Sequence, residues 1–160
     1  MTYGCVPLSA NYHAVTDNRE MPSSSGQAEP AKAPRPLRIL VCDDDRDTAL
    51  TLTAILRDEG HEVTALHSGR NVLSTAIRTE PDVVVLDIHL PDVSGWQLAQ
   101  TIRARRKKGP LLIGISGVYT ASSDRIVANM SGFDHYLVKP YAPAELLALL
   151  APLRDPSARQ

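Results

Sequence analysis

Hydrophobic and polar residues follow two different periods along this chain from Leu37 onward. Short apolar runs bounded by turn residues predict strands at residues 38–42, 62–66, 82–86, 111–115 and 135–138. Longer amphipathic stretches predict helices at residues 46–59, 70–79, 96–107, 123–130 and 144–150. Five strand–helix units in a row predict an α/β fold, a doubly wound five-stranded parallel sheet with helices on both faces.

The third predicted strand has the strongest apolar character. Residues 83–86 read "VVVL", a continuous run rather than an alternation of polar and apolar residues. Such a run is typical of a central strand in a parallel sheet, because helices bury both of its faces. Gly60 and Gly132 follow two of the predicted helices, where glycine C-caps are expected.

The first 36 residues differ from the rest in composition. They contain several prolines and the stretch "SSSG" at residues 23–26, and they show no sustained apolar period. Such a segment buries too little surface to offset its ordering entropy, so we interpret residues 1–36 as a flexible tail. We expect the folded domain to span residues 37–153 and a short tail to span residues 154–160. That tail is too short for an output domain, so we expect the chain to act through its own surface.

Composition narrows the range of functions. The formal net charge is -1, which argues against binding to nucleic acid or a membrane surface, and the basic cluster at residues 103–108 is interpreted as a solvated helix end. The two cysteines, Cys5 and Cys42, show neither disulfide-framework nor metal-ligand spacing, so we expect reduced thiols. With no apolar run of membrane-spanning length and no signal-peptide pattern, we expect a cytoplasmic protein.

Chemically active side chains follow several of the predicted strands. Ligands bind doubly wound sheets at the carboxyl ends of the strands, so these side chains are expected to meet in one site. They are Asp43, Asp44 and Asp45 after the first strand, Asp87 after the third, Ser116 after the fourth and Lys139 after the fifth.

This combination of side chains favours phosphoryl transfer. Neighbouring carboxylates repel one another unless a cation neutralises them, and Mg²⁺ prefers carboxylate, water and phosphate oxygens. Asp87 stands alone at its strand end and is the candidate nucleophile, which would form an aspartyl phosphate. Ser116 and Lys139 are candidates to bind the phosphoryl oxygens.

Four motifs together carry a resemblance to a known family. They are "RILVCDDD" at residues 38–45, "DIHLPDVSG" at 87–95, "LIGISG" at 112–117 and "HYLVKPY" at 135–141. In this order and at these separations, the chain from residue 37 to about 153 resembles the receiver domain of two-component response regulators. The resemblance implies the flavodoxin-like (βα)5 fold. Gly117, where the family commonly has alanine, and Cys42, where it commonly has an aliphatic residue, are mild departures.

The resemblance also implies roles for individual residues. The metal site would hold Mg²⁺ on Asp43, Asp44, Asp87 and the backbone carbonyl of His89. Asp87 would be phosphorylated, and Lys139 would pair with the phosphate and precede a cis peptide bond to Pro140. Ser116 and Tyr136 would act as the conformational switch.

The implied partners follow from the family. A histidine kinase or a histidine phosphotransferase would donate the phosphoryl group, and a downstream protein that the sequence does not identify would receive the signal. A homodimer through the fourth helix, fifth strand and fifth helix is a further expectation. The chain would catalyse its own phosphorylation and dephosphorylation and would not be an enzyme in the ordinary sense.

Two other functions stay open at this point. The stretch "VCDDDRDT" at residues 41–48 partly resembles haloacid-dehalogenase-like phosphatases, in which Asp43 would be the nucleophile and Asp45 the general acid. The second is a receiver-like interaction module that is not phosphorylated. Considered singly, Asp45 and Asp92 are interpreted as turn or N-cap residues, and Trp96 as a partly buried anchor of the third helix.

Overall fold

Five parallel strands form one sheet in the order β2-β1-β3-β4-β5 in the computed structural model. The structure describes residues 35–105, 109–117 and 132–154. Its elements are β1 (Arg38–Cys42), α1 (Arg46–Asp58), β2 (Glu62–Leu66), η1 (Gly69–Asn71), α2 (Val72–Thr79), β3 (Val83–Asp87), α3 (Gly95–Arg105), β4 (Leu111–Ser116), β5 (His135–Val138) and α5 (Pro143–Arg154). The predicted fold class and the flavodoxin-like strand order are therefore confirmed. The helix predicted at residues 123–130 lies outside the described residues.

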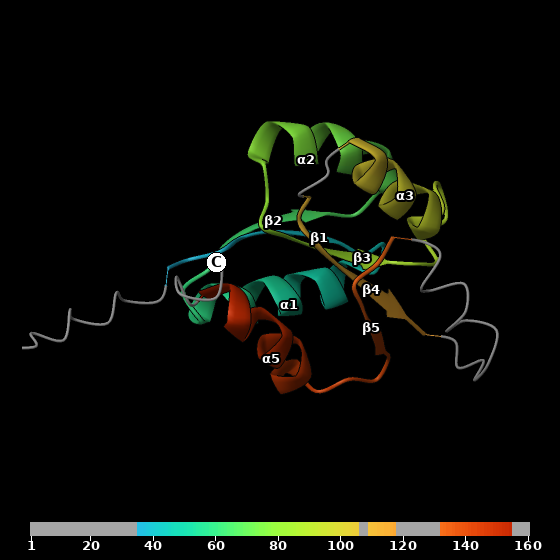
Figure 1. The fold of residues 1–160 in the computed structure, drawn as a ribbon. Helices are drawn as coiled ribbons and strands as arrows, with labels where there is room; N and C mark the ends of the chain where they lie inside the picture. Colours follow the sequence, from blue (N-terminus) through green and yellow to red (C-terminus); the bar gives the residue numbers. More distant parts are fainter. Residues whose placement is uncertain (1–34, 106–108, 118–131, 155–160) are drawn as a thin grey trace, which may run out of the picture. The chain divides into compact units, whose positions relative to one another are not determined.

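Strand β3 lies at the centre of the sheet, between β1 and β4. All five of its residues are buried, as its continuous apolar run predicts. Helices α1 and α5 cover one face of the sheet and α2 and α3 cover the other (Figure 1). The domain has two hydrophobic cores, and alternate residues of β3 divide between them. Val83 and Val85 belong to one core, whereas Val84 and Leu86 belong to the other.

Two strands extend one residue farther than their apolar pattern indicates. Strand β3 begins at Val83 and includes Asp87, and β4 includes Ser116. Backbone pairing does not depend on side-chain polarity, so Asp87 still pairs in register with Ile115. The candidate nucleophile and the candidate hydroxyl are consequently fixed by the sheet itself rather than by the loops that follow.

The helix boundaries also differ in detail. The helix predicted at residues 70–79 begins with the 3-10 turn η1 and becomes α-helical at Val72. Helix α3 spans Gly95–Arg105, and α5 is longer than predicted because it continues through Pro152 to Arg154. Helix α1 ends as expected before Gly60, whose φ of 85° is a left-handed conformation that suits glycine.

Arg103 is not part of a solvated helix end, contrary to the interpretation of the basic cluster. Its guanidinium donates hydrogen bonds to the carbonyl oxygens of Gly132 (2.8 Å) and Pro110 (3.2 Å) and to the carboxylate of Asp134. Asp134 also accepts a hydrogen bond from the Leu112 N–H (2.7 Å). Arg103 therefore joins the end of α3 to the segments that enter β4 and β5.

A buried histidine, His61, lies just before β2. His61 is 5% exposed, and its Nδ1 accepts a hydrogen bond from the Leu37 N–H (3.3 Å). Burial lowers the pKa of His61, and the charge of Arg154 acts in the same direction, whereas Glu59 opposes them. The hydrogen bond from Leu37 requires a free lone pair on Nδ1, so the folded protein favours the neutral imidazole.

Arg35 contacts the domain just before the predicted domain boundary. Its guanidinium donates two hydrogen bonds to the carboxylate of Asp82, at 3.1 and 3.0 Å. Asp82 also accepts from the Arg38 N–H (2.9 Å), at the entry to β1. Arg35 therefore ties the segment before β1 to the segment before β3. None of the helices described there combines the length and the apolar character needed to cross a membrane.

Candidate functional site

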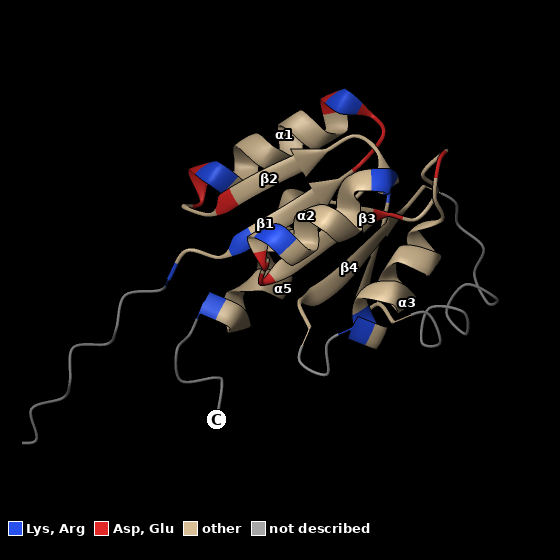
Figure 2. Ribbon diagram, turned by 90° about the horizontal axis from the view of Figure 1, so that it is seen from above, with Lys and Arg blue, Asp and Glu red and all other residues tan. Residues whose placement is uncertain are grey.

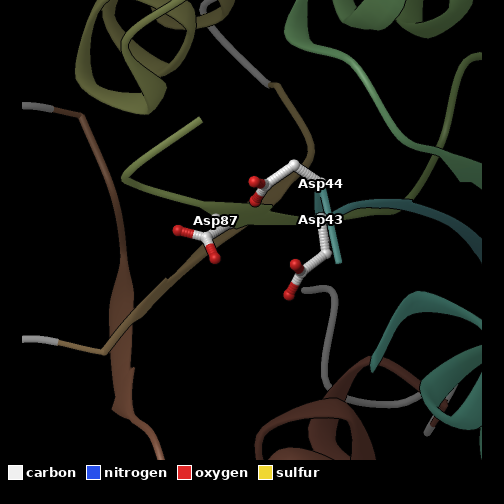
Figure 3. A group of neighbouring side chains, drawn as sticks. All are labelled: Asp43, Asp44 and Asp87. Carbon is white, nitrogen blue, oxygen red and sulfur yellow. The ribbon is translucent and has the colours of Figure 1, made fainter. Parts of the chain in front are cut away.

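Three carboxylates meet at the carboxyl edge of the sheet. Asp43 and Asp44 follow β1, and Asp87 ends the neighbouring strand β3 (Figure 3). The register pairs Cys42 with Leu86, which places the next residues of the two strands side by side. One carboxylate oxygen from each of the three aspartates lies within 4.8 Å of the others. Figure 2 shows the acidic residues in red where β1 joins α1 and where β3 ends.

The three carboxylates differ in their exposure to solvent. Asp43 and Asp87 are only 2% and 7% exposed, whereas Asp44 is exposed. The site is therefore buried on the side of the sheet and open to solvent on the side of Asp44.

Lys139 neutralises part of this charge. Its Nζ donates hydrogen bonds to Asp43 Oδ2 (2.8 Å) and Asp87 Oδ2 (2.7 Å). Partial burial lowers the pKa of Lys139, but the hydrogen bonds and charges of Asp43 and Asp87 outweigh this effect and raise it above its ordinary value. Lys139 is therefore fully charged at neutral pH.

The loop after β5 brings Lys139 to the site. The Lys139 N–H donates a hydrogen bond to the carbonyl oxygen of Ser116 at 2.8 Å, which ties the loop to the end of β4. The peptide bond between Lys139 and Pro140 is cis, as the resemblance implied. Ser116 itself is 8% exposed and ends the strand beside Asp87. Five of the six residues that the sequence assigned to one site therefore lie at this edge, while the sixth, Asp45, caps α1.

The donor set fits a hard divalent cation. Three carboxylates carry three negative charges, and the ammonium of Lys139 balances one of them. The remaining charge and the oxygen donors match the preference of Mg²⁺ or a similar ion. The His89 backbone N–H donates a hydrogen bond to Asp87 Oδ1 (2.8 Å), while the His89 side chain is exposed.

Tyr136 lies in an aromatic cluster beside the site. Its ring centroid is 5.6 Å from Trp96 and 5.3 Å from Phe133, and the ring also lies over Gly114, where an added Cβ would approach the tyrosine Cε1 to 3.0 Å. Trp96 is half-buried at the start of α3, as predicted. Tyr136 is therefore packed in this conformation, and its role as a switch stays a prediction.

The phosphatase alternative does not fit the position of Asp45. This carboxylate caps α1, where it accepts hydrogen bonds from the Asp47 N–H (3.0 Å) and the Thr48 hydroxyl (2.7 Å). The hydrogen bond from Thr48, followed by those from the backbone, lowers the pKa of Asp45. An ionised cap is unsuited to the general acid that this alternative requires.

Two buried or capping residues have structural explanations. Burial raises the pKa of Cys42 to about 12, so its thiol stays protonated at neutral pH. Asp92 is a cap, but it caps η1, the 3-10 turn that leads into α2, rather than the helix that follows it in the sequence. Sequence reasoning missed this contact because capping rules look only at near neighbours in the chain.

Comparison with known proteins agrees with this geometry. A family model described as the response regulator receiver domain matches residues 39–151. The transcriptional regulatory protein PrrA of Mycobacterium leprae is 37% identical over 111 residues, which cover 69% of this chain and 47% of PrrA. The chain thus spans about half the length of that relative.

Solved structures show the same likeness. The receiver domain of the Francisella response regulator 1452 superposes with a TM-score of 0.68 at 26% identity and covers 76% of this chain and 98% of its own. The BeF3-activated N-terminal receiver domain of Klebsiella pneumoniae RstA gives a TM-score of 0.67 at 26% identity, over 77% of this chain and 99% of its own. The described fold is therefore similar to both receiver domains over nearly their full length.

Proposed function

The chain belongs to the response regulator receiver domain family, and we propose that Asp87 accepts a phosphoryl group from a histidine kinase or a histidine phosphotransferase. The observation that carries this proposal is the bridge from Lys139 to both Asp43 and Asp87. It supports the proposal because a charged ammonium contacts both the candidate nucleophile and one member of the acidic pair. The chain would catalyse its own phosphorylation and the later hydrolysis of the product.

In the proposed reaction, a carboxylate oxygen of Asp87 attacks the phosphorus atom of the donor. A phosphorus–oxygen bond to Asp87 forms while the bond from phosphorus to the donor nitrogen breaks, and the donor imidazole keeps that electron pair. The ammonium of Lys139 offsets the charge on the phosphoryl oxygens. The hydroxyl of Ser116 would donate a hydrogen bond to one of them.

We propose that Asp43, Asp44, Asp87 and the backbone carbonyl of His89 hold Mg²⁺. When bound, the ion would supply positive charge beside the phosphoryl oxygens. The support for this assignment is the excess negative charge of the three carboxylates and the exposure of Asp44. Replacing Asp43 and Asp44 together by Asn should remove most of any Mg²⁺-dependent change in Trp96 fluorescence.

Labelling with a small acyl phosphate tests the phosphoacceptor directly. Incubation with Mg²⁺ and acetyl phosphate should add one phosphoryl group to the chain, detected by intact mass, and Asp87→Asn should abolish it. Asp58→Asn, at an exposed position on α1, is the matched control and should label normally. Labelling that persists in Asp87→Asn, or that appears on a histidine, would sink the assignment. Repeated turnover of a phosphate ester would favour the phosphatase alternative instead.

We propose that phosphorylation changes the surface made by residues 123–130, β5 and α5, of which residues 123–130 lie outside the described residues. A phosphate on Asp87 would attract the Ser116 hydroxyl, and Tyr136 would move in response. Partner binding or dimerisation would then strengthen. Amide exchange with and without a beryllium fluoride mimic decides this point: changes confined to the loops around Asp87 and Lys139 would contradict the switch.

A further inference from the structure

Two loops at the acidic edge are joined through one carboxylate. Asp92, in the loop between β3 and α3, accepts hydrogen bonds from the Ser68 hydroxyl (2.6 Å), the Gly69 N–H (3.1 Å) and the Arg70 N–H (3.2 Å). The Arg70 guanidinium lies 3.8 Å from the same carboxylate. Asp92 therefore holds the start of η1 from a loop more than twenty positions away in the chain.

Apolar contacts hold the same two loops together. Gly69 is buried, and a Cβ added to it would lie 3.1 Å from Leu90 Cδ1 and 3.2 Å from Val93 Cβ. These distances mean that the backbone at Gly69 lies directly against side chains of the β3–α3 loop. The hydrogen bonds of Asp92 and this close approach are independent observations of one rigid junction.

The junction lies next to the groups that would perform the chemistry. The β3–α3 loop carries His89, whose N–H donates a hydrogen bond to Asp87 Oδ1 and whose carbonyl is the proposed metal ligand. The β2–α2 loop also approaches the other acidic strand end, because His67 Nδ1 lies 3.4 Å from the carbonyl oxygen of Asp43. A shift of the β2–α2 loop would therefore reach both Asp43 and Asp87.

We propose that Asp92 is a positioning residue, which holds the β3–α3 loop so that the His89 backbone and the Asp87 carboxylate face the cation and the incoming phosphoryl group. This role rests on the proposed function. Removing a residue that orients a metal ligand commonly lowers metal affinity or activity by about 10- to 100-fold. The hydrogen bond from Ser68, with those from Gly69 and Arg70, lowers the pKa of Asp92 to about 2, so the carboxylate is ionised at neutral pH.

The test compares Asp92→Ala with Asp92→Asn. The alanine variant loses every hydrogen bond of the carboxylate, whereas the asparagine variant keeps one acceptor oxygen of the same reach. We expect Asp92→Ala to weaken Mg²⁺ binding and to slow labelling of Asp87 by about 10-fold each. Asp92→Asn should recover most of both losses.

Asp82→Ala is the matched control. Asp82 also accepts several hydrogen bonds and lies near an arginine. It precedes β3, however, so it lies at the end of the sheet where the strands begin, away from the acidic edge. Its removal should lower stability and leave Mg²⁺ affinity and labelling rate unchanged. An effect of Asp82→Ala equal to that of Asp92→Ala would mean that general destabilisation explains both, and the proposal would fail.

A measurement without metal separates this proposal from the proposed function. In Mg²⁺-free buffer, the His89 amide should exchange faster in Asp92→Ala than in the wild type, because its acceptor on Asp87 is less well placed. Absence of labelling in the wild type would refute the phosphoacceptor role, while Mg²⁺ titration and His89 exchange would still decide the role of Asp92. Unchanged Mg²⁺ affinity and unchanged His89 exchange in a folded Asp92 variant would overturn it.

Discussion

Replacing Lys139 by Met removes the only positive charge that the described residues place on Asp43 and Asp87 by hydrogen bonds. The methionine side chain has a similar length and can fill the same space without the ammonium. Two nearly buried carboxylates would then face each other with no compensating cation. Their repulsion should lower the free energy of unfolding in the absence of divalent ions.

The magnitude follows from the burial of the ion pairs. Removing one member of a buried pair costs about 3–5 kcal/mol. The Lys139 side chain is 28% exposed, so solvent screens part of the interaction and the lower end, about 3 kcal/mol, applies. For a domain of this size, such a loss lowers the melting temperature by about 10 °C.

The assay is thermal unfolding in EDTA and in excess Mg²⁺. Mg²⁺ at about 100 times its dissociation constant should return about 2.7 kcal/mol, so the variant should recover much of its melting temperature. Arg105→Met removes an exposed charge at the far end of α3 and should change neither value by more than about 0.5 kcal/mol. If Lys139→Met melts at the wild-type temperature in EDTA, the ammonium does not neutralise the carboxylates and the electrostatic account is wrong.

Two further predictions concern stability away from the site. Burial lowers the pKa of His61 from its ordinary value of 6.5, so the unfolded chain binds more protons than the folded one as the pH falls through that value. Stability should therefore decrease below about pH 6.5, and urea unfolding at several pH values should show a weaker decrease in His61→Asn, which keeps an acceptor at this position. Equal slopes for both proteins would contradict the assignment. Deleting residues 1–34 should leave the melting temperature unchanged. Deleting residues 1–36 also removes Arg35 and its bonds to Asp82, and should cost up to about 1 kcal/mol; a large loss from the shorter deletion would show that the first segment docks on the domain.

The sequence by itself determined the parallel sheet and the composition of the acidic edge. Short-range periodicity separates strands from helices, and strands of a parallel sheet all end at the same edge. Asp43, Asp87 and Lys139 could therefore be assigned to one site although Asp43 and Lys139 are 96 positions apart in the chain. The continuous apolar run before Asp87 likewise identified the central strand, because only such a strand needs apolar side chains on both faces.

The tertiary structure decided which polar groups pair and where loops meet. Asp92 has the local signature of a turn residue, and nothing near it in the sequence indicates that it caps η1. Arg103 belongs to a basic run and nevertheless joins α3 to the segments before β4 and β5. In both cases the partner is set by the packing of distant loops, whereas periodicity and capping rules describe only neighbours within a few residues. The elements and the site residues are thus properties of local pattern and strand order, and the bonds that hold the site in position arise only when the loops pack together.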